Sequence, residues 1–102
     1  MRRLSISALT VLQAVANGYH YGFDVIEATG LPSGTVYPAL SRLERDAYVR
    51  SAWEDEEAAH AEGRPARRYY RVTATGTRAL NEALAYYRSI IAPLRGPRRQ
   101  ER

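Results

Sequence analysis

The sequence predicts a small α+β domain that is mainly α-helical and carries one β hairpin, and three observations lead to this class. Apolar residues recur at helical spacing in several segments of the 102-residue chain. Two later segments instead alternate apolar and polar residues, which is typical of strands with one buried face. A polar stretch containing Gly63 and Pro65 separates these two segments and predicts the turn of a hairpin.

The composition is that of a globular protein, with 45% hydrophobic and 25% charged residues. No apolar run is long enough to span a membrane, and the first residues lack the continuous apolar core of a signal peptide. We therefore expect a cytoplasmic protein with no membrane partner. The net charge is +4 and all fifteen basic residues are arginines, which favours a polyanionic partner.

Nothing in the sequence indicates an enzyme, a bound metal or another cofactor. Cysteine is absent, which excludes disulfides, thiol catalysis and cysteine-ligated zinc. The two histidines, His20 and His60, lie far apart and lack metal-binding spacing. We also find no nucleophile beside a base and no pair of carboxylates at catalytic spacing.

Two short helices are predicted in the first third of the chain. The first runs from Ser5 to Ala16 and is stopped by Asn17-Gly18, and the second runs from Gly22 to Thr29 with Gly30 as its C-terminal cap. The apolar positions are Ile6, Leu9, Leu12 and either Val15 or Ala16 in the first helix, and Phe23, Val25 and Ile26 in the second.

The stretch Ser33 to Glu44, SGTVYPALSRLE, predicts a third helix although it contains a proline. Its open face is polar and basic, and its buried stripe consists of Val36, Leu40, Leu43 and Ala47. The first N–H groups of a helix have no intrahelical partner, so a helix beginning between Ser33 and Thr35 tolerates Pro38 at small cost. The tight turn before this helix is typical of a helix-turn-helix, which occurs in DNA-binding proteins and in ordinary helical bundles.

Two strands are predicted after the third helix, from Tyr48 to Glu54 and from Arg67 to Thr73, each with one buried and one exposed face. Tyr69 and Tyr70 therefore face opposite ways, so one of them packs in the core and the other faces outward. The stretch between them, DEEAAHAEGRPA, is expected to be a long mobile loop. A helix-turn-helix followed by a hairpin is a winged helix. A run of arginines without acidic residues accompanies the hairpin, and it consists of Arg64, Arg67, Arg68, Arg71 and Arg78. The alternative interpretation of this run is a solvated loop.

The last predicted helix follows Thr73 or Thr75, either of which would serve as its N-cap. It carries two adjacent apolar stripes, of Leu80, Leu84, Tyr87 and Ile91 and of Ala79, Ala83, Tyr86 and Ile90. A domain this small has too little core to cover both stripes, so we expect packing on the first helix and on a second copy of the chain. The residues predicted to form this homodimer are Leu80, Ala83, Leu84, Tyr87, Ile90 and Ile91.

These elements divide the chain into three parts. Residues 1–73 form the winged helix-turn-helix, and residues 74–94 form the dimerisation helix. Residues 95–102 form a basic tail that is expected to be disordered.

Four motifs occur in an order that is typical of one family: YGF at 21–23, GTVYPALSRLE at 34–44, Trp53, and GRPARRYYRVTATG at 63–76. With these motifs the chain resembles the PadR family of bacterial transcription regulators. The resemblance implies a dimeric winged-helix repressor, and some members of this family respond to small aromatic or cationic compounds. Asp46-Ala47 departs from the family pattern, which usually has glycine after the third helix, and the single C-terminal helix resembles the short-tailed branch without a separate ligand domain.

By this resemblance and by helical geometry, the third helix would enter the major groove of a pseudo-palindromic operator. Arg42 is the candidate for reading a base, Arg45 for binding a phosphate, and Pro38 would stiffen the contacting turn. The wing arginines would follow the neighbouring backbone or the minor groove. The expected DNA-binding residues are Ser33, Gly34, Thr35, Tyr37, Pro38, Ser41, Arg42, Arg45, Arg64, Arg67 and Arg68.

The resemblance also implies a small-molecule effector, for which the seam between two subunits is the expected place. Trp53, Tyr86 and Tyr87 would line such a pocket, because aromatic rings bind planar or cationic compounds. The alternative is that these side chains are ordinary core residues. For the whole protein, the alternative is a protein-binding winged-helix adaptor without specific DNA recognition, and the basic face of the third helix argues against it.

Overall fold

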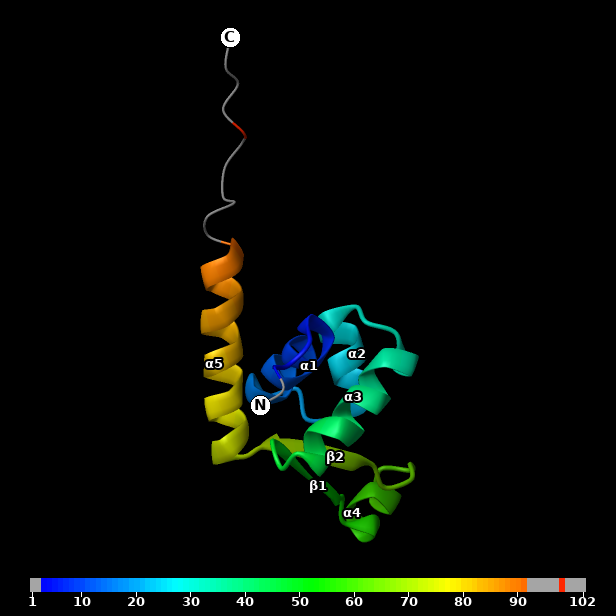
Figure 1. Ribbon diagram of the computed structural model, residues 1–102. Helices are drawn as coiled ribbons and strands as arrows, with labels where there is room; N and C mark the ends of the chain where they lie inside the picture. Colours follow the sequence, from blue (N-terminus) through cyan, green and yellow to red (C-terminus); the bar gives the residue numbers. More distant parts are fainter. Residues whose placement is uncertain (1–2, 92–97, 99–102) are drawn as a thin grey trace.

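The computed structural model describes residues 3–91 and 98 (Figure 1). In chain order its elements are α1 (Ile6–Ala16), α2 (Gly22–Thr29), α3 (Ser33–Arg45), β1 (Val49–Trp53), α4 (Glu56–Ala61), β2 (Arg68–Val72) and α5 (Ala74–Ile91). This mostly helical order with one antiparallel hairpin confirms the predicted fold class. Apart from residue 98, the predicted basic tail lies outside the described residues, as do positions 92–94 of the predicted last helix.

Short-range signals set the ends of α1 and α2 where the sequence predicts them. The Ser5 hydroxyl oxygen accepts a hydrogen bond from the Ala8 N–H at 3.1 Å and caps α1. Gly30 adopts φ 73° and closes α2 by donating its N–H to the Ile26 carbonyl. Both bonds join residues within one helical turn, so local sequence is enough to place them.

The core lies where α1, α2 and α3 pack together above the hairpin (Figure 1). The side chains at its centre are at most 1% exposed: Val11, Leu12, Val15, Val25, Val36, Leu40, Leu43 and Val49. Three residues assigned to the apolar faces of the first three helices are exposed instead. Ile6 and Phe23, each in the first turn of its helix, are 56% and 61% exposed, and Ala47 lies beyond the end of α3.

The two strands pair in antiparallel register, with Val49 opposite Val72. Of the two tyrosines predicted to face opposite ways, Tyr70 points into the core and is 8% exposed. An isolated bridge joins Tyr21 to Tyr69, so the segment before α2 lies along the second edge of β2. This pairing ties the hairpin to the helix-turn-helix.

The tip of the hairpin differs from the sequence prediction. The expected mobile loop contains the short helix α4. Asp55 caps this helix by accepting a hydrogen bond from the Glu57 N–H at 3.0 Å. Ala59, on its inner side, is only 1% exposed. A local cap and the burial of one alanine therefore order a segment whose composition is polar.

Ala47 adopts the left-handed backbone conformation, φ 64°, in the turn between α3 and β1. Its N–H donates to the Glu44 carbonyl and the Tyr48 N–H donates to the Leu43 carbonyl, which are the paired bonds of a Schellman motif. The Thr73 hydroxyl donates to the Ala47 carbonyl at 2.7 Å and holds the turn from the other side. The turn therefore keeps the geometry usual for glycine, at the expense of a strained alanine.

Thr73 is the N-cap of α5, which decides between the two predicted caps. Its hydroxyl oxygen accepts a hydrogen bond from the Gly76 N–H at 2.9 Å. Gly76 is required by close packing, because a Cβ at this position would collide with the Tyr48 carbonyl. The start of α5 is thus fixed against the turn that follows α3.

α5 leaves the hairpin and runs beside α1, and its last turns extend beyond α1 (Figure 1). Leu80 and Ala83 are buried in the core, and the Tyr87 hydroxyl donates to the Leu4 carbonyl at 2.6 Å. Among the described helices, none is long and apolar enough to cross a membrane.

Candidate nucleic-acid interface

The exposed face of α3 follows from the angle of about 100° between successive helical residues. The buried side consists of Val36, Ala39, Leu40 and Leu43. The opposite side consists of Gly34, Pro38, Ser41 and Arg45, all of them exposed. One flank of the exposed face carries Thr35 and Arg42, and the other carries Tyr37 and Glu44.

The start of α3 presents backbone N–H groups to solvent. Pro32 occupies the N-cap position without a side-chain hydrogen bond, and Ser33 and Gly34 are exposed. N–H groups in the first turn of a helix carry partial positive charge and bind phosphate oxygens well, and no acidic residue lies in this turn. A Cβ on Gly34 would meet nothing within 4 Å. This glycine is therefore not needed for internal packing, and it leaves the backbone open to a partner.

α3 begins within the predicted range, and this start places Pro38 in the second turn of the helix. The helix begins at Ser33, and the Val36 N–H already donates to the Pro32 carbonyl at 3.0 Å. An N–H at position 38 would donate to the Gly34 carbonyl, and proline removes that donor. The expectation of a small cost is therefore wrong, because Pro38 lies beyond the first turn.

The side chains at the margins of the exposed α3 face differ in how far they pack against the rest of the chain. The Tyr37 ring packs against Gly22 of α2, where a Cβ would overlap the ring, and Tyr37 is still 47% exposed. Arg42 and Arg45 are exposed in the last turn of α3. Together with Arg3 they line a hollow of about 280 Å³ between the start of α1 and the end of α3. The positive charge of α3 is thus concentrated at its C-terminal end.

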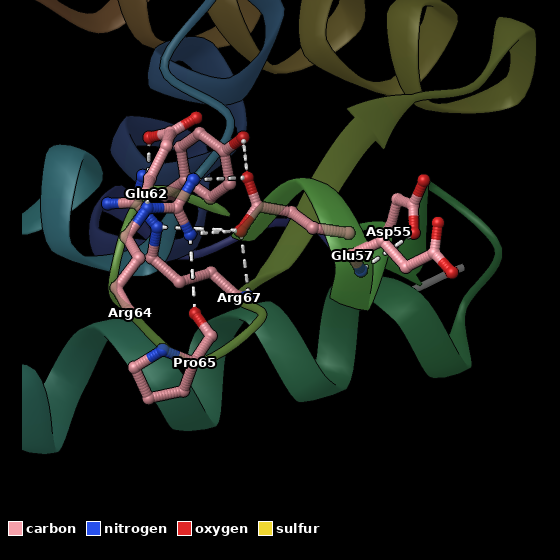
Figure 2. A network of polar contacts seen from close by, with 8 residues as sticks. Asp55, Glu57, Glu62, Arg64, Pro65 and Arg67 are labelled. Atoms are coloured by element: carbon pink, nitrogen blue, oxygen red, sulfur yellow. Dashed lines mark hydrogen bonds and ion pairs between the residues drawn. The ribbon is translucent and has the colours of Figure 1, made fainter. Parts of the chain in front are cut away.

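Arg64 and Arg67 converge on one carboxylate at the end of β1, that of Glu54 (Figure 2). The Nη1 and Nη2 atoms of Arg64 lie 2.6 Å and 3.1 Å from the two Glu54 oxygens. Arg67 donates its backbone N–H to the same carboxylate at 2.8 Å, and its guanidinium lies 4.5 Å from the centre of the Tyr21 ring. The Tyr21 hydroxyl also donates to Glu54, at 2.9 Å, so the network joins the hairpin to the start of α2.

These donors lower the pKa of the Glu54 carboxyl from about 4.5 to about 2. The largest cause is the hydrogen bond from Arg64, and the Arg67 N–H and the Tyr21 hydroxyl add to it. The pKa of the Tyr21 phenol is raised, first because its proton is held by Glu54. The carboxylate therefore stays charged at neutral pH and holds both arginines.

The Arg68 side chain contacts Ser51 and Glu44 on the face of the hairpin that faces α3. Its Nε donates to the Ser51 hydroxyl at 2.8 Å, and its Nη2 lies 3.3 Å from a carboxylate oxygen of Glu44 in α3. Its guanidinium also lies 5.8 Å from the centre of the Trp53 ring, and Trp53 is 65% exposed.

All three predicted wing arginines thus have acidic partners within the chain. Sequence reasoning missed these partners because Glu54 is 10 residues from Arg64, and Glu44 is 24 residues from Arg68. No helical or strand periodicity links positions so far apart. The only signal available was the acidic patch before the arginine run, which does not say which residues pair.

The predicted dimerisation residues fall into two groups. Leu80 and Ala83 are buried within the chain, and Leu84 and Tyr87 pack against the same core. Ile90 and Ile91, near the end of α5, are 44% and 59% exposed. Packing within the chain therefore buries part of the predicted dimerisation face, and the side chains of Ile90 and Ile91 in the last turn of α5 remain exposed.

The three aromatic residues expected in an effector pocket are not brought together within one chain. Trp53 is the last residue of β1 and lies beside Arg68. Tyr86 lies about 18 Å along α5 from the start of that helix. The Arg3 guanidinium lies 3.4 Å from the centre of the Tyr86 ring, and the Tyr87 ring is 5.1 Å away. A pocket lined by all three would require a second copy of the chain.

A helix-turn-helix with an exposed third helix, followed by an antiparallel hairpin, defines the winged-helix class of DNA-binding folds. The model of the transcriptional regulator PadR-like family matches residues 11–82, and the chain belongs to this family. The match confirms the resemblance carried by the sequence motifs.

Solved structures share the fold at low sequence identity. A PadR family transcription regulator from Clostridium difficile has a TM-score of 0.71 at 19% identity, covering 90% of this chain and 100% of that one. A PadR family regulator from Eggerthella lenta has a TM-score of 0.71 at 24% identity, covering 85% and 76%. Bordetella bronchiseptica BpsR, whose DNA binding is regulated by 6-hydroxynicotinic acid, has a TM-score of 0.74 at 19% identity, covering 95% and 69%. None of the curated proteins matches the chain.

Proposed function

We propose that this chain is a sequence-specific DNA-binding transcription regulator that works as a homodimer and represses its target gene. The observation that carries the proposal is the exposed face of α3, which has open backbone N–H groups at one end and Arg42 and Arg45 at the other. Such a face fits the phosphate backbone and the major-groove acceptors of duplex DNA. Membership of the PadR-like family supports the proposal. A regulator of this kind would act in the cytoplasm.

In this proposal the N-terminal turn of α3 leads into the major groove. Ser33 and Gly34 would bind phosphate through backbone N–H groups and Thr35 through its hydroxyl, since the Thr35 N–H donates to the Pro32 carbonyl. Tyr37, Pro38 and Ser41 would line the contact. Arg42 is proposed to read a base and Arg45 to bind a phosphate. Because Arg45 lies nearer the middle of the exposed face and Arg42 on its flank, base reading has to be tested at both positions.

Arg64, Arg67 and Arg68 are proposed to bind the DNA backbone beside the groove. Each of them has an acidic partner in the free protein, so a DNA phosphate has to share or displace that partner. The Arg68–Glu44 pair is the easiest to open, because its side chains are 45% and 35% exposed, against 26% and 15% for Arg64 and Glu54. Arg68 is therefore the first wing residue to test.

The homodimer is proposed to form through the exposed end of α5, where Ile90 and Ile91 are open to solvent. Two-fold symmetry would place two copies of α3 on a pseudo-palindromic operator. A small aromatic or cationic effector is proposed to bind at this seam near Tyr86 and Tyr87. Trp53 would contact such an effector only if the second copy of the chain supplied it. The regulation of BpsR by 6-hydroxynicotinic acid is a parallel in a protein of the same fold.

The proposal is tested by the fluorescence anisotropy of labelled duplexes that tile the region upstream of the gene, with random duplex as competitor. We expect one pseudo-palindromic segment to bind tightly, and the affinity to fall with salt because phosphate contacts release counterions. Absence of DNA binding at both low and high salt would contradict the proposal and favour the protein-binding adaptor.

Variants separate base reading from phosphate binding. Arg42→Ala is expected to weaken operator binding by about 1–3 kcal/mol and to change binding to random duplex much less. Arg68→Ala is expected to weaken both alike, because a phosphate contact carries no sequence information. Equal losses on operator and random duplex for Arg42→Ala would remove its base-reading role, and a selective loss for Arg45→Ala would transfer that role to Arg45.

A further inference from the structure

The outer face of the hairpin carries two arginines side by side. Arg50 and Arg71 are partners in the register of β1 and β2, and both are exposed. The hydrogen bond from the Thr73 N–H to the Tyr48 carbonyl makes these two residues a hydrogen-bonded pair of the antiparallel ladder. Hydrogen-bonded and non-hydrogen-bonded pairs alternate along such a ladder. Arg50 and Arg71 are therefore a hydrogen-bonded pair, whose Cα atoms lie about 5.5 Å apart.

This outer face turns away from α3. Side chains alternate along a strand, so Arg50 and Arg71 point to the side opposite Ser51 and Tyr70. Ser51 donates to Glu44 of α3, and Tyr70 is buried in the core. A duplex bound on the exposed face of α3 would therefore lie on the other side of the hairpin.

The charges of Arg50 and Arg71 are not balanced in the part of the chain that the structure describes. Within residues 3–91 and 98, neither side chain forms an ion pair or a side-chain hydrogen bond. The carboxylate of Glu54, which follows β1, is bound by Arg64 and Arg67. Like charges directly opposite each other in a sheet are destabilising, and an anion bound between them would remove the repulsion.

A hollow of about 480 Å³ lies at this pair of arginines. Its walls include Ala52, Tyr69 and Ala74 beside Arg50 and Arg71, and the Arg71 guanidinium lies 5.5 Å from the centre of the Tyr69 ring. The volume is within the range of small-molecule sites, which combine apolar walls with a few charged groups. Positive charge, an aromatic ring and apolar surface thus meet at one place.

We propose that this hollow binds a small phosphomonoester that carries a flat apolar group, the chemistry of a nucleoside monophosphate. The two guanidiniums bind the phosphate, whose charge of about −1.5 to −2 at neutral pH matches two fixed positive charges better than a single carboxylate does. The flat group lies beside Tyr69, with Ala52 and Ala74 as apolar walls. This site is separate from the α3 surface and from the seam at α5, and it does not rest on the DNA-binding proposal.

Isothermal titration calorimetry of the full chain with adenosine 5′-monophosphate tests the proposal, with adenosine, inorganic phosphate and benzoate as comparisons. We expect the monophosphate to bind most tightly, since only it combines the dianion with the flat group. Its affinity should fall as the pH drops below about 6, where the phosphate gains a proton. Arg50→Ala and Arg71→Ala should each lower its affinity at least tenfold.

The matched control is Arg45→Ala, which removes an exposed arginine from α3 and should leave monophosphate binding unchanged. In the absence of ligand, Arg50→Ala and Arg71→Ala should keep or raise the thermal unfolding midpoint, because each relieves the repulsion between like charges. A loss of binding in these variants is then not a loss of folding.

Unchanged monophosphate affinity in both arginine variants would overturn the proposal. Equal affinity for benzoate would overturn the assignment to phosphate. If the monophosphate does not bind and Arg50→Ala instead weakens duplex binding as much as Arg45→Ala, the outer face is a DNA contact and the small-ligand site is wrong. Failure of the wild-type chain to bind any duplex would contradict only the DNA-binding proposal.

Discussion

Ala47 shows how a single residue can keep a backbone geometry that it disfavours. Its φ of 64° lies in the left-handed region, where an alanine is less stable than a glycine by roughly 1 kcal/mol or more. The Schellman bonds on one side and the Thr73 hydroxyl on the other hold the turn in place. The strain persists because its surroundings determine the turn from two directions.

Ala47→Gly is therefore expected to stabilise the protein by about 1 kcal/mol, because glycine adopts positive φ without strain. The thermal unfolding midpoint should rise by about 4–8 °C for each kcal/mol gained in a domain of this size. The control is Ala85→Gly on the exposed side of α5, which should destabilise by about 1 kcal/mol through helix propensity. A decrease in stability for both variants would show that Ala47 is unstrained.

Glu54 is the residue whose charge ties the hairpin to α2. Its pKa of about 2 in the folded protein lies below its ordinary value near 4.5, so the unfolded chain takes up a proton more readily. The stabilisation from the carboxylate is therefore complete above about pH 4.5 and is lost as the pH falls towards 2.

Glu54→Gln should accordingly lower the unfolding midpoint at neutral pH, and the gap to the wild type should close as the pH falls from about 4.5 towards 2. Differential scanning calorimetry across this range measures the gap. Glu82→Gln, which removes an exposed carboxylate from α5, controls for the change in net charge. A gap that stays constant with pH would contradict the assigned role of the ionised carboxylate.

At the scale of elements, α3 combines an unfavourable residue with an open surface. Pro38 removes the donor for the Gly34 carbonyl, and both residues lie on the exposed side of the helix. The apolar side of α3, by contrast, is completely packed. Core packing thus keeps the helix intact while its outer face departs from ideal helical chemistry, which is common where a surface serves binding.

Pro38→Ala should stabilise the protein by up to about 3 kcal/mol, because alanine restores the missing donor and removes the ring from the helix interior. Operator affinity should fall at the same time, since the contacting turn loses its stiffness. Chemical denaturation and anisotropy on the same samples measure both effects. Ser41→Ala is the matched control, expected to weaken binding with a gain in stability of at most about 0.5 kcal/mol from helix propensity. A destabilised Pro38→Ala would contradict this account.

The hairpin shows where periodicity stops being informative. Alternation puts Tyr70 and Trp53 on the same side of the sheet, yet Tyr70 is buried in the core and Trp53 is largely exposed. The difference arises because Tyr70 lies under the helical cluster, whereas Trp53 lies at the tip end of β1 beside Arg68. A side-chain direction is a local property, but burial depends on what lies above it.

At the scale of the whole molecule, α5 has two roles. Its first half completes the core through Leu80 and Ala83, and its end leaves Ile90 and Ile91 exposed. Exposed apolar side chains grouped at one end of a helix favour association, because burying them removes apolar surface from water. The monomer fold and the proposed dimer thus use different lengths of the same helix.

Ile90→Ser combined with Ile91→Ser should raise the dimer dissociation constant at least tenfold, since burial of each side chain contributes on the order of 1.5–3 kcal/mol. Light scattering after size-exclusion chromatography measures the change, and circular dichroism should remain that of the wild type. Phe23→Ser removes an equally exposed apolar residue from α2 and should leave the oligomeric state unchanged. A dimer of undiminished stability in the double variant would place the interface elsewhere.

Sequence alone determined the class of fold, the family and the bounds of the main helices. Ser5 and Gly30 act on backbone groups within a few residues, so their effect can be deduced without the fold. The apolar stripe of α3 likewise follows from helical spacing. The exposed face of α3, which we propose binds DNA, was predicted for the same reason, since it is the side of the helix left over when the apolar side is buried.

Only the tertiary structure decided which charges are paired and which remain open. Arg64, Arg67 and Arg68 are bound to Glu54 and Glu44, whereas Arg50 and Arg71 stand opposite each other without an ion pair in the described part of the chain. The order within α4 and the open end of α5 were decided in the same way. Local sequence sets backbone conformation through bonds within one turn, but ion pairing and burial depend on distances between segments that only the folded chain brings together.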